Sequence, residues 1–195
     1  ADVSEATCAY VRELGLDAIV VIGGDGSMAI AHQLAAKGIP VVGCPKTIDN
    51  DLAHTDRSFG FDTAVAIVTE ALDRLQTTGR SHGRVMILET MGRYAGWIAL
   101  HAGLAGGADI ILIPELPYRL EEVARVCRER EAREHYTLIA IAEGARPEGG
   151  QLTVKERIED SPEPIRLGGV GNVLRTQLEP LVGCEVRTTI LGHVQ

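Results

Sequence analysis

Residues 17–45 read DAIVVIGGDGSMAIAHQLAAKGIPVVGCP, and this stretch decides the fold class. A run rich in Val and Ile leads through three glycines into an amphipathic segment, and a second apolar run, Pro40–Cys44, follows. Short apolar runs that alternate with longer amphipathic segments are typical of βαβ units, whose strands are parallel. Residues 17–45 therefore predict an α/β fold built on a parallel sheet.

The same alternation continues along the chain. Strands are predicted at Asp17–Ile22, Pro40–Cys44, Arg84–Glu89, Ala108–Pro114, Tyr136–Ala142 and Glu185–Leu191. Most of them are apolar throughout, as expected for strands covered by helices on both faces. Helices are predicted at Ser4–Leu14, Ser27–Lys37, Thr63–Thr77, Trp97–Ala105, Leu120–Glu134 and Gly171–Leu181, with C-cap glycines at Gly38, Gly79, Gly106 and Gly183. The Pro-containing stretch Gly144–Gly168 predicts a surface loop with a short strand at Gln151–Val154.

Composition narrows the function classes. The 195 residues include 27 acidic and 19 basic side chains, and the net charge of −8 argues against nucleic-acid binding. No run of 18 apolar residues occurs, so no membrane span is expected. The four cysteines are scattered without a CxxC pair, which favours reduced thiols in a cytoplasmic protein.

Ligands of open parallel sheets bind at the carboxyl ends of the strands, so the loop Gly23–Ser27 is the first candidate. Glycine backbone and a helix N-terminus together make an anion site, and Asp25 could face a phosphate through Mg²⁺. The alternative is a tight strand–helix turn with Asp25 or Ser27 as N-cap. The loop lacks the Gly-Lys-Ser/Thr of a Walker A motif and the full GxGxxG dinucleotide fingerprint.

The second candidate loop is Pro45–Asp51, which carries a lysine, a hydroxyl and two carboxylates. In an extended loop, alternation would point Thr47, Asp49 and Asp51 the same way. One carboxylate could then take a proton while the other holds a metal ion. The alternative is a turn in which the Asp and Asn side chains cap the local backbone.

Charged residues also flank the later strands. Arg84 opens one strand, Arg93 and Glu143 follow the ends of two others, and Arg187 and His193 flank the last. Arginine binds phosphate oxygens in pairs, and a neighbouring glycine leaves room for a ligand. Each of these residues taken singly also fits a surface ion pair or a capped loop.

With these motifs in place, the sequence resembles the phosphofructokinase family. The matching strings are GGDGS (23–27), PKTIDND (45–51), GFDTA (60–64), MGRYAG (91–96) and LGHVQ (191–195), in the family's order. The glycine loop alone would also fit NAD kinases and lipid kinases, but the TIDND string speaks against them. The resemblance implies a two-domain fold, with 1–60 part of the nucleotide-binding (donor) domain and 61–195 mainly the sugar-phosphate-binding domain.

The resemblance implies transfer of the γ-phosphoryl group of Mg-ATP to the 1-hydroxyl of fructose 6-phosphate, a step of glycolysis. Asp49 would be the base and Thr47 would line the transfer path, both contacting substrate. The metal would be held by Asp25 and Asp51, the second also near the sugar. The donor would be bound by Gly24, Asp25, Gly26, Ser27 and Lys46. The sugar phosphate would be bound by Met91, Gly92, Arg93, Glu143 and His193, with Arg93 also counted as catalytic.

Two further implications concern the donor and the assembly. Gly26 resembles ATP-using members, in which a small residue leaves room for the nucleotide, whereas Lys46 resembles the pyrophosphate-using branch. We expect ATP, with pyrophosphate as the alternative and an inactive regulatory or assembly subunit as a further one. Arg84 and Arg187 resemble arginines that reach across a subunit interface, which implies a homo-oligomer, a dimer or tetramer. Family members also extend beyond both ends, so we expect further chain before Ala1 and after Gln195.

Overall fold

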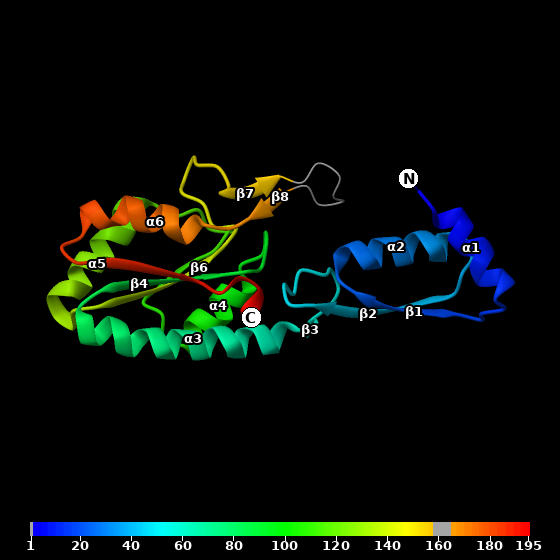
Figure 1. Ribbon diagram of the computed structural model, residues 1–195, viewed down its shortest axis with the longest axis horizontal. Coiled ribbons are helices and arrows are strands. Elements are labelled where there is room, and N and C mark those ends of the chain that lie inside the picture. The colour runs from blue at the N-terminus through cyan, green and yellow to red at the C-terminus, as the bar shows by residue number, and fades with distance from the viewer. Residues whose placement is uncertain (1, 158–164) are drawn as a thin grey trace. The chain divides into compact units, whose positions relative to one another are not determined.

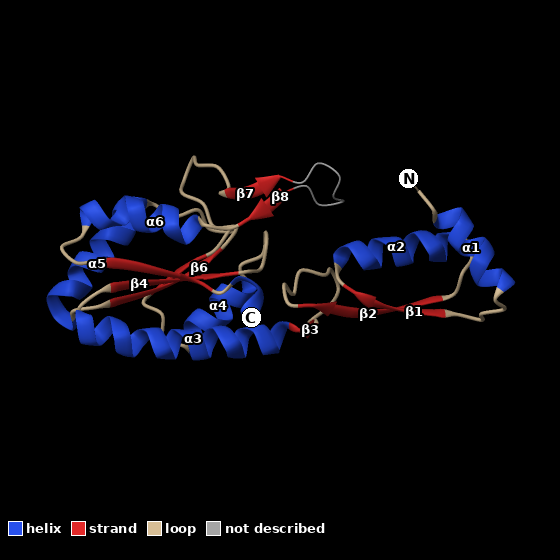
Figure 2. Ribbon diagram, in the orientation of Figure 1, coloured by secondary structure: helices blue, strands red, loops and turns tan. Residues whose placement is uncertain are grey.

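The computed structural model describes residues 2–157 and 165–195, and these fall into two compact units, residues 1–60 and 61–195 (Figure 1). Each unit contains its own sheet with helices packed on it (Figure 2). All strand pairs described in these two sheets are parallel, which confirms the predicted α/β fold class. The assignment of the two units to donor and sugar phosphate stays a prediction.

The first unit is a three-stranded sheet with two helices. In chain order it consists of α1 (Ser4–Glu13), β1 (Ile19–Gly23), α2 (Asp25–Ala36), β2 (Val41–Thr47) and β3 (Phe59–Gly60). The strand order is β1-β2-β3, and Ile19 of β1 pairs with Val41 of β2. Cys8 and Val11 of α1 pack with Leu34 of α2 and with Ile39, and this cluster forms the small core of the unit.

One face of this small sheet is not covered within the unit. Val20, Ile22 and Val42 are 65%, 64% and 60% exposed, whereas their neighbours along β1 alternate toward the helices. The expectation that these apolar strands are covered on both faces is therefore wrong for β1 and β2. The reason is that α2 packs against both strands and α1 packs on α2, so the helices share one face.

The second unit contains a four-stranded sheet of order β5-β6-β4-β9, flanked by helices on both faces (Figure 1). Its elements are α3 (Phe61–His82), β4 (Val85–Thr90), α4 (Trp97–Ala105), β5 (Ile110–Leu112), α5 (Leu120–Glu134), β6 (Thr137–Ala142), α6 (Val170–Leu178) and β9 (Val186–Ile190), with short 3₁₀ turns at Glu179–Leu181 and Gly192–Val194. Helices α3 and α4 cover one face, and α5 and α6 cover the other. Every residue of β4 and β6 is buried, which confirms the expectation for the central strands.

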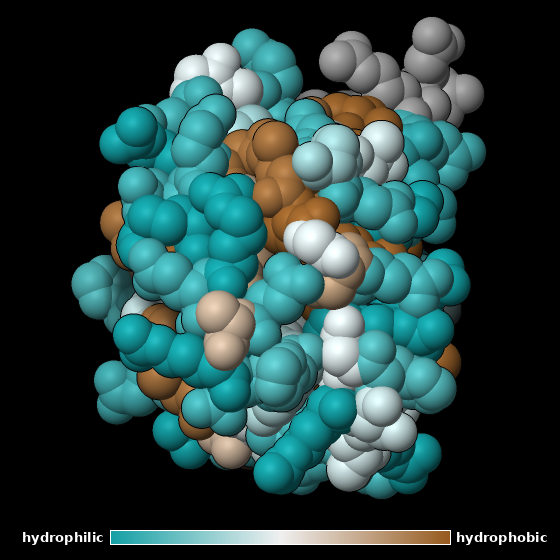
Figure 3. Space-filling view, turned by 90° about the vertical axis from the view of Figure 1, so that its left-hand side faces the viewer, coloured by the Kyte–Doolittle hydropathy of each residue, from teal (hydrophilic) through white to brown (hydrophobic). Residues whose placement is uncertain are grey.

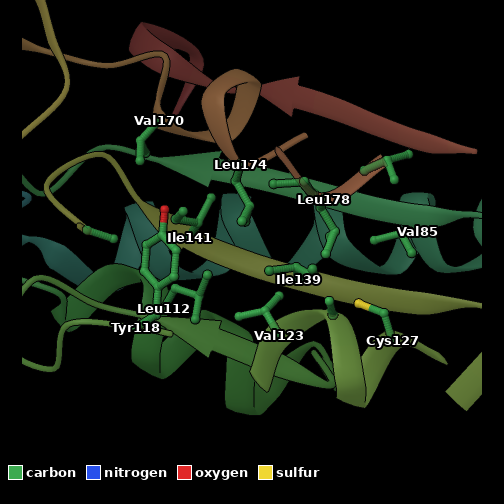
Figure 4. Close-up of a cluster of buried hydrophobic side chains, with 14 residues drawn as sticks. Val85, Leu112, Tyr118, Val123, Cys127, Ile139, Ile141, Val170, Leu174 and Leu178 are labelled. Atoms are coloured by element: carbon green, nitrogen blue, oxygen red, sulfur yellow. The ribbon is translucent and has the colours of Figure 1, made fainter. Parts of the chain in front are cut away.

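The main core lies between the sheet and helices α5 and α6 (Figure 4). Ile139 and Ile141 of β6 face Leu174 and Leu178 of α6, and all four side chains are fully buried. Burying one such side chain contributes about 1.5–3 kcal/mol relative to leaving it in water. This core fixes the sheet on which the later loops are carried.

Helix α3 is longer than the sequence indicated. The prediction ended it at Thr77 with Gly79 as the C-cap, but α3 continues to His82, and Gly79 is buried within it. A Cβ at Gly79 would lie 2.9 Å from Cγ of Met86, so glycine is needed there for close packing of α3 on β4. Gly83, with φ +63°, follows the helix in its place.

Other boundaries also differ. Strand β2 runs to Thr47, so the first part of the predicted loop Pro45–Asp51 is strand. The predicted strand Gln151–Val154 is instead β7 (Val154–Arg157), which pairs antiparallel with β8 (Ile165–Leu167). Gly183 is not a C-cap, because α6 ends at Leu178 and a 3₁₀ turn follows it. Gly38 and Gly106 do follow or cap their helices as predicted.

The surface of the second unit is mostly hydrophilic on the side that Figure 3 shows, with hydrophobic residues gathered in its upper centre and scattered elsewhere. Within residues 2–157 and 165–195, no helix is both long and apolar enough to cross a membrane. The four cysteines, Cys8, Cys44, Cys127 and Cys184, are all free, in agreement with the predicted reduced thiols.

The Cys127 thiol offers a test of the core. Its burial raises its pKa to about 12, so it stays protonated at pH 8. We expect iodoacetamide at pH 8 to modify the half-buried Cys44 of the native full-length protein well before Cys127, because the thiolate is the nucleophile. Peptide mass spectrometry measures both rates, and denaturant, which removes the difference, is the control. Equal rates in the native protein would contradict the described core.

Candidate functional site

The second unit has a cavity at the carboxyl ends of three adjacent strands. Strands β6, β4 and β9 are parallel neighbours, so the loops that follow them meet at one edge of the sheet. The cavity has a volume of about 730 Å³. Its walls contain four predicted sugar-phosphate residues, Met91, Arg93, Glu143 and His193. Gly92, the fifth, lies in the turn between Met91 and Arg93.

The turn after β4 has an unusual backbone. Gly92 has φ +133° and Arg93 has φ +54°, which is uncommon for a residue with a side chain. The Arg93 N–H donates a hydrogen bond of 2.9 Å to Oε1 of Glu143, at the end of the neighbouring strand. Gly144 allows this approach, because a Cβ there would lie 2.1 Å from the carbonyl oxygen of Arg93. Glu143 therefore holds the turn that places Arg93 at the cavity.

A second wall of the cavity was not predicted. It comes from β7, β8 and the start of α6, and includes Lys155, Gly168, Gly169 and Asn172. Glu89, the last but one residue of β4, is only 2% exposed and accepts hydrogen bonds from the N–H groups of Gly169 (2.7 Å) and Gly171 (2.8 Å). Glu89 appears in the sequence only as the end of an apolar strand, and its partners lie 80 and 82 residues away.

The cavity wall carries charges of both signs: the carboxylates of Glu89, Glu143 and Glu156, and the cations Arg93 and Lys155. The carboxylates of Glu89 and Glu143 both accept hydrogen bonds from backbone N–H groups, which compensates part of their negative charge. Arg93 and Lys155 contribute two cationic side chains to the wall, and the exposed His193 adds a further donor. Cationic side chains beside glycine backbone are a common arrangement for binding phosphate.

Arg84 and Arg187 lie elsewhere. Arg84 precedes β4 and Arg187 is the second residue of β9, so both are at the edge of the sheet where the strands begin. Each forms an ion pair with Glu185. Glu89 and Ile190 are the cavity-lining residues of these two strands. At about 3.3 Å per residue, Arg84 lies roughly 16 Å before Glu89, and Arg187 lies roughly 10 Å before Ile190. The structure therefore does not bring these two predicted residues to the cavity of their own chain.

In the first unit, the glycine loop leads directly into a helix. Helix α2 begins at Asp25 with Gly24 as its N-cap, so the alternative in which Asp25 or Ser27 is the N-cap residue is wrong. Gly23 is required by the chain itself, since a Cβ there would lie 2.3 Å from Cβ of Ser27. A Cβ at Gly26 would meet nothing within 4 Å. Packing within the described chain thus does not explain the glycine at position 26.

The second loop of this unit lies beside the first. A Cβ at Gly24 would lie 3.5 Å from Cβ of Thr47, so the N-terminus of α2 and the end of β2 are neighbours. Beyond Thr47 the chain turns. The Asp49 N–H donates to Oγ1 of Thr47 (3.2 Å), and Asn50 has φ +54°. The backbone is therefore not extended here, so the alternation on which the prediction for Thr47, Asp49 and Asp51 rested does not apply. That their side chains point the same way stays a prediction.

Ser58 holds this turn and was not predicted. It is buried, its N–H donates to Oδ1 of Asn50 (2.8 Å), and its hydroxyl donates to the carbonyl oxygen of Thr47 (2.8 Å). The turn that carries Asp49 is thus fixed from both sides. This agrees with the alternative of a locally capped turn and leaves the predicted role of Asp49 open, since a rigid turn also presents a carboxylate well.

The predicted metal ligands fit magnesium by their chemistry. Among residues 2–157 and 165–195, no three or more His, Cys, Asp or Glu side chains gather as a metal site. Mg²⁺ is commonly bound by one or two carboxylates together with phosphate oxygens and water, and does not need a full protein cage. Asp25 and Asp51 are exposed carboxylates of the first unit, and as metal ligands they stay a prediction.

The family model and the curated relatives agree on one family. The family model described as phosphofructokinase matches residues 1–195. An ATP-dependent 6-phosphofructokinase 2 of Clostridium perfringens is 53% identical over all of this chain and 54% of its own length. A pyrophosphate–fructose 6-phosphate 1-phosphotransferase of Streptomyces coelicolor is 52% identical over 93% of this chain and 54% of its own. The chain spans about half the length of the curated relatives that it matches.

The fold is also similar to that of solved structures. The phosphofructokinase of Pichia pastoris in its T-state superposes with a TM-score of 0.82 and 28% identity, covering 98% of this chain and 22% of that one. Both comparisons extend over both units of the chain.

The turn at Gly92 can be tested by substitution. A Cβ at Gly92 would lie 2.6 Å from the carbonyl oxygen of Ala95, whereas one at Gly107, which also has positive φ, meets nothing. We expect Gly107→Ala to lower the free energy of unfolding by about 1–2 kcal/mol through strain alone. Gly92→Ala should cost about 1–3 kcal/mol more through the clash. Chemical denaturation of the full-length variants measures both, and equal losses would contradict the described turn.

Proposed function

We propose, because this chain belongs to the phosphofructokinase family, that the full-length protein transfers the γ-phosphoryl group of ATP to the 1-hydroxyl of fructose 6-phosphate. The observation that carries the proposal is the cavity at the ends of β6, β4 and β9, where Arg93, Glu143 and His193 meet. A phosphorylated sugar has the charge and the hydroxyl groups that this set of side chains can bind. The product is fructose 1,6-bisphosphate.

The donor site of the proposal lies in the first unit. The amides at the start of α2 and the glycine loop offer hydrogen bonds to phosphate oxygens. When bound, Mg²⁺ neutralises charge on the transferred phosphoryl group, and Asp25 and Asp51 are the residues that would hold it. Thr47, next to Gly24, lines the path between the phosphates and the acceptor.

Asp49 is the proposed general base. Its turn is fixed by the hydrogen bond from its own N–H to Thr47 and by Ser58, so little reorganisation is needed to present the carboxylate. The carboxylate accepts the proton of the 1-hydroxyl as the oxygen attacks the γ-phosphorus, and the leaving ADP carries the charge away. Positioning and charge compensation supply the rest of the rate in phosphoryl transfer.

The acceptor site is formed by the turn of Met91, Gly92 and Arg93 together with Glu143 and His193. Arg93 would bind the 6-phosphate and hold the sugar for transfer, Glu143 would accept hydrogen bonds from sugar hydroxyls, and His193 would donate to a hydroxyl or phosphate oxygen. Glu143 also keeps Arg93 in its left-handed conformation. A single carboxylate would thus serve both the turn and the ligand.

Arg84 and Arg187 enter the proposal as residues of a neighbouring subunit. Their place at the far edge of the sheet supports a contact with the cavity of another copy better than with their own. We therefore propose a homo-oligomer, a dimer or tetramer, in which each acceptor site receives these two arginines across an interface. The pairing with Glu185 would keep the two cations together.

The proposed donor is ATP. Gly26 supports it, because a side chain there would project into space that the chain itself leaves open. Lys46, which is exposed at the end of β2, is the observation that favours the second candidate, a pyrophosphate-dependent enzyme. The relatives carry both kinds of name. A cytoplasmic location also belongs to the proposal and is supported by the four free cysteines.

Asp49→Asn tests the base. We expect kcat of the full-length enzyme to fall by roughly 10²–10⁴-fold, because the amide cannot accept the proton. The KM for fructose 6-phosphate should change far less. Asp56→Asn, at an exposed position of the same loop, is the matched control and should leave both constants near wild type. An unchanged kcat in Asp49→Asn would remove Asp49 as the base.

Parallel assays with ATP and pyrophosphate test the donor and the reaction. The wild-type full-length protein with Mg²⁺ and fructose 6-phosphate should form fructose 1,6-bisphosphate with ATP. Gly26→Asp should reduce the ATP-dependent rate much more than any pyrophosphate-dependent rate, and Gly26→Ala controls for the loss of glycine. Turnover with pyrophosphate only would reject the donor, and tight binding of fructose 6-phosphate without turnover would support an inactive subunit.

A further inference from the structure

The most unusual buried group outside the predicted site is the carboxylate of Glu89. It lies at the end of the central strand β4, is 2% exposed, and lines the cavity with its neighbours. Both of its oxygens are used. Oε1 accepts from the N–H of Gly169 (2.7 Å) and Oε2 from that of Gly171 (2.8 Å).

These two N–H groups are at the start of helix α6, for which Gly169 is the N-cap. The first N–H groups of a helix have no partner within it, and they carry the positive end of the helix dipole. Glu89 thus compensates the helix terminus, and the terminus compensates the buried charge. The carboxylate gives each N–H group its own acceptor oxygen, whereas an amide side chain has one oxygen and an NH₂ donor in place of the other.

The contact is possible only because the chain before α6 is glycine. Gly168 and Gly169 have φ values of +135° and +87°. A Cβ at Gly171 would lie 3.1 Å from Oε2 of Glu89 and 2.9 Å from Cγ2 of Thr188. The Glu89 carboxylate therefore fits closely against the glycine backbone, and a shift of either would break these hydrogen bonds.

The fixed segment is a wall of the cavity. Gly168, Gly169 and Asn172 line it directly, and β8 leads into Gly168 while pairing with β7, which carries Lys155. The Cδ of Lys155 lies 3.8 Å from the position of a Cβ on Gly168. Asn172 belongs to this segment, and Lys155 is joined to it through the pairing of β7 with β8. Among the described hydrogen bonds, those of Glu89 join the segment to β4.

We propose that Glu89 is a positioning residue for the acceptor cavity, holding the segment Gly168–Asn172 so that Asn172 and Lys155 line the cavity together with Arg93. The inference rests on the proposed function, because it takes the cavity as the site of a phosphorylated sugar. It also assigns the phosphate to side-chain cations, since the α6 N-terminus, which is elsewhere a ready anion site, is already occupied by a carboxylate.

Steady-state kinetics of the full-length enzyme tests the proposal through Glu89→Gln. The amide keeps the size of the side chain but places a donor against one of the two N–H groups. We expect the KM for fructose 6-phosphate to rise by roughly 10–100-fold as the wall shifts, with little change in the KM for ATP or in kcat. A merely destabilised protein would instead lose kcat and affect both substrates.

Asp109→Asn is the matched control. Asp109 is also a shielded carboxylate that accepts a backbone N–H, that of Leu138 (2.8 Å), but it does not line the cavity. Its substitution should lower thermal stability and leave the KM for fructose 6-phosphate unchanged. A normal KM in folded Glu89→Gln overturns the proposal, as does an equal rise in Asp109→Asn.

A second variant covers the case in which Glu89→Gln does not fold. Gly169→Ala leaves Glu89 intact and meets no neighbouring atom, but it strains the positive φ of the same segment. We expect the same selective rise in the KM for fructose 6-phosphate, and an unchanged KM overturns the proposal. A wild-type enzyme that does not phosphorylate fructose 6-phosphate refutes the proposed function instead, so the two failures are distinguishable.

Discussion

Two carboxylates at the ends of neighbouring parallel strands organise the cavity of the second unit. Glu143 directly follows β6 and holds the Gly92–Arg93 turn, while Glu89 near the end of β4 holds the start of α6. Both accept hydrogen bonds from backbone N–H groups, so they help to determine the path of two glycine-rich segments. A buried carboxylate without hydrogen-bond partners is strongly unfavourable. Moving either loop away from its strand would therefore cost the free energy of leaving that carboxylate without partners.

Much of the fold could be predicted, because strands and helices leave periodic patterns in the sequence. The alternation of apolar runs and amphipathic segments placed six of the parallel strands and the helices between them. The errors have physical causes. Gly79 resembles a C-cap in sequence but is required by the approach of Met86, and β1 is apolar on a face that no helix of its unit covers. Packing partners decide both cases, and the pattern of a single helix or strand does not reveal them.

The site residues that could be predicted from the sequence are those that directly follow the end of a predicted strand. Arg93, Glu143 and His193 each follow a strand end, and the rule for parallel sheets was enough to group them. Glu89 and Ser58 were missed because each acts on a segment elsewhere in the chain, through backbone groups that carry no side-chain signature. The turn at Asn50 was likewise invisible to an argument that assumed an extended backbone after Thr47.

The uncovered face of the first sheet has a practical consequence for work with fragments. Val20, Ile22 and Val42 together form an apolar surface on a sheet of only three strands. A fragment of residues 1–60 expressed by itself would carry that surface into water, where such faces promote self-association. Studies of the isolated glycine loop by solution methods would therefore need polar residues at these three outward positions, none of which contributes to the small core under α1 and α2.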